Sequence, residues 1–165
     1  MLWQLHQLVL GAHILVAIIW VGGVMFIGWG LFLAIRRWNF SDQRRILSEV
    51  MNWAHWPLTF AGVFVIVTGI LLGTVLGPIH QWADIWQSRY GITWVTALLV
   101  GLFTLTWGVF VGNKMAIKLF FQKDIWENAD SGDKRPLFRR LAMIAASESV
   151  EVIGFIILIY LMISY

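Results

Sequence analysis

The chain contains four histidines and no cysteine, so its histidines are the first candidates for chemistry. His6 and His13 are seven residues apart, which places them on one face of a helix and about 10 Å apart along its axis. Neutral imidazole is a ligand for haem iron and for copper. The lack of cysteine excludes disulfides, thiolate metal sites and a cysteine nucleophile. The sequence therefore points to a histidine-based metal or haem centre.

His6 and His13 cannot readily bind one iron together, because they lie two turns apart on the same helix. A pair formed by His13 and His80 is geometrically easier, since His80 belongs to a later segment that would fold over His13. Arg89 would then pair with a haem propionate, because a guanidinium matches a carboxylate in a bidentate pair. The alternative is that each imidazole only makes structural hydrogen bonds.

A second group of polar residues is expected deeper in the chain's apolar segments. Asn113, Lys114 and Glu148 should lie at similar depth, with Glu151 one turn deeper, and ionisable groups inside a membrane suggest function because they are costly there. We predict a Lys114–Glu148 pair and a proton or charge relay that also includes Asn113 and Glu151. An interhelical brace is the alternative. His55, near the same layer and several methionines, is a candidate copper ligand.

The composition decides what kind of scaffold positions these residues. The 165 residues are 59% hydrophobic and 13% charged, with a mean hydropathy of +0.76, which excludes an ordinary soluble domain. Residues 1–35, 50–83 and 90–113 contain no Asp, Glu, Lys or Arg. Each run exceeds the ~20 residues that span a bilayer. A fourth apolar segment, 141–165, is interrupted by two glutamates.

We therefore predict an all-α integral membrane protein, a single domain built as a four-transmembrane-helix bundle in a lipid bilayer. Its helices are expected at about 6–35, 56–77, 92–119 and 140–164. The segment Pro78 to Arg89 has an apolar and a polar helical face, which predicts a short interfacial helix between the second and third spans. The polar stretch 122–136 is typical of a mobile loop.

The basic residues predict the topology. Eleven of the twelve lie in or beside the loops after the first and third spans: Arg36, Arg37, Arg44, Arg45, Lys114, Lys118, Lys123, Lys134, Arg135, Arg139 and Arg140. By the positive-inside rule these loops are cytoplasmic and both termini face outward, in a bacterial or archaeal plasma membrane. The net charge of +3 is thus explained by topology, and we expect no nucleic acid partner.

Glycines recur at helical spacing in the second and third spans. They are Gly62, Gly69, Gly73 and Gly77 in one, and Gly101, Gly108 and Gly112 in the other. Small residues at this spacing favour close helix packing. A flat macrocycle between helices would need the same pattern.

Several short motifs resemble the membrane domain of the copper-resistance CopD family over nearly the whole chain. They are His13, Trp20-Val21-Gly22-Gly23, Thr68-Gly69, Tyr90-Gly91, Asn113, Arg139-Arg140 and Glu148. The resemblance extends to the related HemJ-type protoporphyrinogen oxidases, four-helix proteins that hold haem b through a histidine of the first helix. It implies His13 as that ligand. Those enzymes also use a lysine early in helix 3, where this chain has Thr96 and Ala97, which argues against the oxidase activity.

Three functions follow as hypotheses. The first is a haem b-binding protein for electron transfer, alone or as a subunit of a larger respiratory or redox complex, with a redox partner protein or a second copy of the chain. The second is CopD-like copper transport or copper resistance. The third is a structural accessory subunit whose polar residues are braces.

Overall fold

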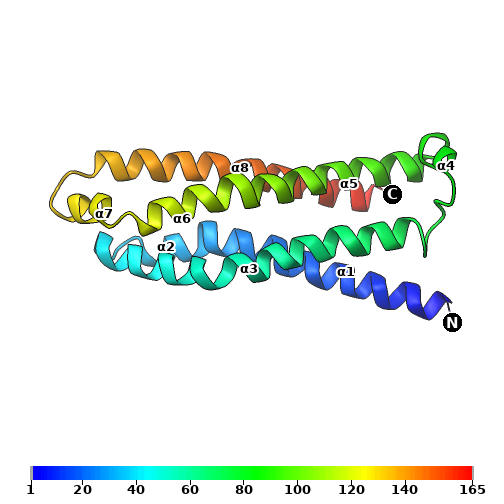
Figure 1. Cartoon of the computed structure of the whole chain (residues 1–165), viewed down its shortest axis with the longest axis horizontal. Coiled ribbons are helices and arrows are strands. Elements are labelled where there is room, and N and C mark those ends of the chain that lie inside the picture. Colours follow the sequence, from blue (N-terminus) through cyan, green and yellow to red (C-terminus); the bar gives the residue numbers. More distant parts are fainter. Residues whose placement is uncertain (1, 165) are drawn as a thin grey trace.

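The computed structural model describes residues 2–164, and these residues form helices joined by short turns (Figure 1). Four stretches are long and apolar enough to cross a membrane, which confirms the predicted all-α four-span bundle. The first span consists of α1 (Leu2–Met25), the π-helical turn η1 (Phe26–Leu31) and α2 (Phe32–Ile35), and the second span is α3 (Phe40–Gly73). The third span consists of α5 (Arg89–Trp107), the π-helical turn η2 (Gly108–Gly112) and α6 (Asn113–Phe121). The fourth span is α8 (Arg135–Ile163).

The spans pack as two antiparallel pairs, α1 on α3 and α5 on α8. Figure 1 shows both chain ends and α4 (Trp82–Gln87) at one end of the bundle, and α7 (Lys123–Asp130) at the other. Many large apolar side chains point outward, among them Leu15 and Phe103, as a lipid-facing surface requires. Which end faces the cytoplasm stays a prediction from the basic residues.

The second span starts much earlier than predicted, at Phe40 instead of residue 56. Pro57, which suggested a helix start, lies inside α3. Membrane helices tolerate an internal proline because neighbouring groups compensate for the lost hydrogen bond. The added turns are amphipathic, and their inner face buries Leu47 and Met51 against α6 and α7. The other predicted spans agree with the structure within a few residues at each end.

The stretch 122–136 is not the loop that its polar sequence predicts, because it contains α7. Trp126 is fully buried, and its indole Nε1 donates a hydrogen bond to the carbonyl of Leu119 at 3.0 Å. Its ring also packs against Phe120. One buried tryptophan therefore anchors α7 to the end of the bundle, a contact that composition does not reveal.

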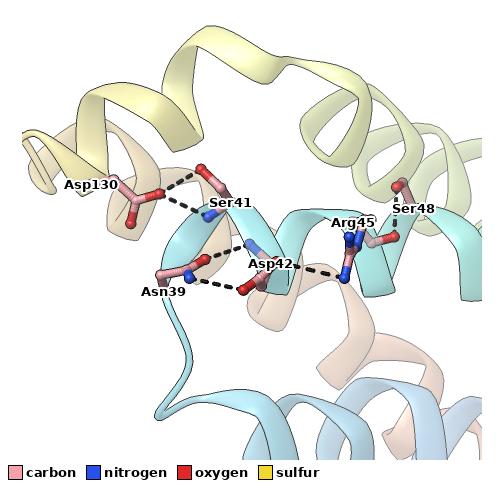
Figure 2. Close-up of polar contacts among 6 residues, drawn as sticks. All are labelled: Asn39, Ser41, Asp42, Arg45, Ser48 and Asp130. Carbon is pink, nitrogen blue, oxygen red and sulfur yellow. Dashed lines mark hydrogen bonds and ion pairs between the residues drawn. The ribbon is translucent and has the colours of Figure 1, made fainter.

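Asp130 connects α7 to the start of α3 (Figure 2). Its carboxylate accepts hydrogen bonds from the backbone N–H groups of Phe40 and Ser41 at 2.8 and 2.9 Å, and from the Ser41 hydroxyl at 2.5 Å. Asn39 caps the same helix by accepting from the Asp42 N–H at 2.7 Å. The free N–H groups of the first helical turn are satisfied in this way.

The hydrogen bond from the Ser41 hydroxyl, with those from two backbone N–H groups, lowers the pKa of Asp130. A lowered folded pKa means that this carboxylate stabilises the fold above its unfolded pKa, and that the contribution is lost as the pH falls through the folded pKa. We expect Asp130→Ala to destabilise the first turn of α3 by about 1 kcal/mol at neutral pH. Amide hydrogen exchange of residues 40–44 measures this. The difference in amide exchange rate between Asp130→Ala and wild type should shrink below about pH 4. The control variant Asp133→Ala, in the same segment, should leave these exchange rates unchanged at any pH.

The short helix α4 confirms the predicted helix between the second and third spans. Asp84 accepts hydrogen bonds from the backbone N–H groups of His80 and Gln81 at 2.9 and 2.8 Å, and these bonds lower the pKa of Asp84. Ile85 is buried against the bundle, while Trp82 and Trp86 are exposed. This arrangement suits a helix that lies on the end of the bundle at a membrane surface.

Candidate functional site

A cavity of about 430 Å³ lies between the four spans in the half of the bundle that holds both chain ends. Its volume is in the range of small-molecule and cofactor sites. The walls are mainly apolar and aromatic, and every span contributes: His13 from α1, Gly69 from α3, Trp94 from α5 and Met162 from α8 are examples. The cavity is therefore a site in which a largely apolar ligand would be shielded from water.

His13 lines this cavity and is held by Thr68 of α3, whose Oγ1 is 2.8 Å from His13 Nδ1. The same hydroxyl is 2.6 Å from the carbonyl oxygen of Phe64, and a carbonyl can only accept. The single hydroxyl hydrogen thus goes to Phe64, so Thr68 accepts from the His13 Nδ1–H. This leaves the lone pair of the neutral imidazole on Nε2. Metal-binding histidines are oriented in this way by a bond from their other ring nitrogen.

His6 lines the same cavity two turns closer to the chain end. Its Nδ1 is 3.0 Å from the carbonyl oxygen of Leu76 and must donate to it, so His6 also carries its lone pair on Nε2 when neutral. The ring stacks on Trp3, with the two ring planes within 3° of each other. The predicted shared face of His6 and His13 is therefore present, and both rings reach one cavity.

His80 and Arg89 do not line the cavity. The side chain of His80 is exposed in the segment just before α4. Arg89 is exposed at the first residue of α5, directly before Tyr90, which does line the cavity. The structure therefore does not bring His80 to the cavity that holds His13, and Arg89 is next in the chain to a residue that lines this cavity.

Small residues give the cavity its width, and one of them lies beside His13. An added Cβ at Gly69 would lie 3.4 Å from the His13 ring carbon Cε1, an ordinary van der Waals contact. The Gly69 carbonyl accepts a hydrogen bond from Trp94 Nε1 at 3.0 Å. At the inner end of the cavity, Trp20 and Phe155 form an edge-to-face pair with ring centres 5.0 Å apart. The glycine stripe of the second span thus serves helix packing and the cavity together.

The two glutamates of the fourth span lie in the other half of the bundle, each facing a π-helical turn. An added Cβ at Gly28 of η1 would lie 2.6 Å from Glu148 Oε2, and one at Gly112 of η2 would lie 2.7 Å from Glu151 Oε1. Glu151 is only 6% exposed, and the neighbouring Ser147 hydroxyl has no hydrogen-bond partner. π-helical turns are frequent at functional sites. Carboxyl groups in this setting can bind and release protons.

The predicted Lys114–Glu148 pair is not formed. Among residues 2–164 the ion pairs are Arg45–Asp42 and Lys123–Glu127, and the Lys114 ammonium instead lies over the Phe110 ring, 5.3 Å from its centre. Lys114 is exposed and so faces outward from the bundle. A relay through the two glutamates stays a prediction, without Lys114 as their partner.

The remaining predicted residues, Asn113 and His55, do not line the histidine cavity. Asn113 is half-buried at the start of α6. His55 donates from Nδ1 to the carbonyl of Met51 at 2.9 Å and packs against Trp56. Within residues 2–164 no three histidine, aspartate or glutamate side chains gather around one point. Met51 is buried in the core cluster against which Met115 packs, so these two methionines serve the packing of the bundle.

Sequence reasoning did not assign roles to Thr68, Trp94 and Met162. Counting residues from the turn between the first two spans does not pair Thr68 with His13, because His13 lies 22 residues before Ile35 and Thr68 lies 28 residues after Phe40. The signal for Thr68 was its place in the Thr68-Gly69 motif. No comparable signal exists for Trp94 or Met162, because aromatic and sulfur-containing residues occur on every face of these helices. No family model, curated protein or solved structure matches the chain.

Proposed function

We propose that the cavity binds haem b and that the protein transfers electrons within a membrane, alone or in a larger redox complex. The observation that carries this proposal is His13: its Nδ1–H is held by Thr68, and its Nε2 carries a lone pair on a side chain that lines a membrane-embedded cavity. This is the orientation in which histidine ligates a metal. The resemblance to haem-binding four-helix proteins supports the same residue.

The residues of the cavity fit a haem. Its walls are apolar on all four spans, and Gly69, Ala97 and Gly101 leave space where larger side chains would fill it. His13 would supply a nitrogen ligand for the haem iron. Met162 of the fourth span lines the same cavity, and its thioether would be available as a second ligand. Arg89, which is exposed and directly precedes the cavity-lining Tyr90, would offer a cation for a propionate group.

Haem b bound here would supply a one-electron redox couple at its iron. The chain would position it and exclude water. Thr68 fixes the direction of the His13 ring through the 2.8 Å hydrogen bond, and Trp94 ties the third span to the second by donating to the Gly69 carbonyl at 3.0 Å. The Trp20–Phe155 pair closes the inner end of the cavity. Apolar packing around the site would favour electron transfer over exchange with solvent.

Copper binding is the second candidate, because His6 and His13 both line one cavity, both use Nδ1 for a hydrogen bond, and imidazole suits copper. The two proposals are separated by one experiment. We expect protein purified in detergent, after expression with a haem precursor, to show a Soret band and to yield haem b on pyridine extraction. Elemental analysis of the same sample should find iron near one per chain and no copper. Copper without a Soret band would overturn the haem proposal in favour of copper, and a sample with neither would favour a structural subunit.

A further inference from the structure

A surface groove lies between α6 and α8, at the end of the bundle that holds α7. Its volume is about 540 Å³. We call it the basic groove and define it by six of its lining residues: Lys118, Arg139 and Arg140, with Met115, Leu119 and Met143. It is remote from the histidine cavity and has no part in the proposed haem site.

The three cations of the basic groove are not neutralised by the protein. None of the residues that line the groove is acidic. Arg140 Nη1 donates a hydrogen bond to Gln122 Oε1 at 3.1 Å, which leaves its charge in place. The ion pairs found within residues 2–164 use other basic residues. Three exposed positive charges at one groove form a strong site for a phosphate group.

The two methionines of the groove lie further into the spans than its cations. Met115 is one turn further into the third span than Lys118, and Met143 is one turn further into the fourth span than Arg139. Leu119 is 1% exposed and belongs to the buried core beneath the groove. The groove thus presents cations at the end of the spans and an apolar path along them.

We propose that the basic groove binds an anionic phospholipid, with the headgroup phosphate at Lys118, Arg139 and Arg140 and an acyl chain against Met115 and Met143. Basic pockets between membrane helices recognise anionic headgroups in this way. A free phosphate ion would use only the cations, and a zwitterionic lipid would gain less from three uncompensated charges. The order of charge and apolar surface along the spans favours the anionic lipid.

The test measures lipid binding to the full chain in detergent by native mass spectrometry. Phosphatidylglycerol, phosphatidylcholine and inorganic phosphate are titrated separately. We expect phosphatidylglycerol to bind more tightly than phosphatidylcholine, and excess inorganic phosphate not to displace it. The variant Lys118→Gln/Arg139→Gln/Arg140→Gln should lose affinity for phosphatidylglycerol on the order of 100-fold, since each charge near the membrane surface contributes to attraction.

The matched control is Arg36→Gln/Arg37→Gln/Arg44→Gln, which removes the same charge at the same end of the bundle but outside the groove. It should change the affinity less than about threefold. Equal losses in both triple variants, equal binding of the two lipids, or displacement by inorganic phosphate would each overturn the proposal. If the groove variant does not fold, Arg139→Gln alone keeps the test decisive: its side chain is exposed, and a loss of about fivefold is expected. No loss there would also overturn the proposal.

Discussion

Replacing His13 by alanine is expected to abolish haem binding while the bundle stays folded. The side chain lines a cavity and is only half-buried, so its loss enlarges a space that already exists. Removing a side chain that only hydrogen-bonds to a metal ligand lowers metal affinity 10- to 100-fold, so removing the ligand itself should lower it by more than about 100-fold. The Soret absorbance per chain after purification measures the effect, and the helical signal in circular dichroism checks the fold.

One variant at another histidine and a second variant at His13 provide the controls for this result. His80→Ala should keep the full Soret band, because His80 is exposed and does not line the cavity. His13→Gly should regain absorbance when imidazole is added, because the lost ring leaves room for the free ligand. A His13→Ala protein that retains its haem would contradict the assigned ligand, whatever the behaviour of the other variants.

The role of Thr68 in this site can be separated from its role in the helix. Thr68→Val has nearly the same shape but cannot accept the His13 Nδ1–H, so we expect haem affinity to fall 10- to 100-fold. Thr74→Val is the matched control on the same helix, since the Thr74 hydroxyl donates to the carbonyl of Ile70 and does not line the cavity. Equal haem affinity in both valine variants would show that Thr68 does not contribute to haem binding.

The second large effect concerns packing of the fourth span on the third. An added Cβ at Gly154 would overlap Thr104 Oγ1 and lie 3.1 Å from Thr104 Cγ2. Thr104 is 1% exposed and donates to the carbonyl of Val100 at 2.8 Å, so it has no space into which to turn. Gly154→Val should therefore force the two helices apart and destabilise the bundle by about 3 kcal/mol. Unfolding of the detergent-purified protein by a denaturing detergent measures this change in the free energy of unfolding.

Two variants test whether the overlap is the cause. Gly11→Val makes the same substitution on α1, where an added Cβ meets nothing within 4 Å, and should leave stability nearly unchanged. The double variant Gly154→Ala/Thr104→Ala removes the atoms that collide and should be more stable than Gly154→Ala alone. If the second substitution gives no recovery, the helix contact is not the source of the loss.

The histidine site shows how far sequence reasoning reaches. The spacing of His6 and His13 placed both rings on one face, and the structure brings both to one cavity. His80 is exposed and does not line that cavity, so the structure offers no support for its pairing with His13. Which of two distant segments reaches a cavity depends on how the helices pack, and the spacing of residues along the chain does not contain that information.

The inner residues show the same limit. Lys114 and Glu148 lie at similar depth, as predicted, but depth along a helix says nothing about rotation around its axis. Lys114 points outward over Phe110, while Glu148 points toward Gly28 of the first span. In α7, likewise, the polar composition suggested a loop, and the buried ring of Trp126 holds a helix there.

The sequence by itself determined the number of spans, their helical nature and the concentration of basic residues around two connections. These features follow from local composition, because any segment of about 20 apolar residues must satisfy its backbone hydrogen bonds internally in a membrane. Only the tertiary structure decided which polar groups meet. The spans are apolar on nearly all sides, so no periodic pattern marks the face that turns inward. Helix rotation was fixed instead by close contacts such as Gly154 on Thr104 and by the hydrogen bond from His13 to Thr68.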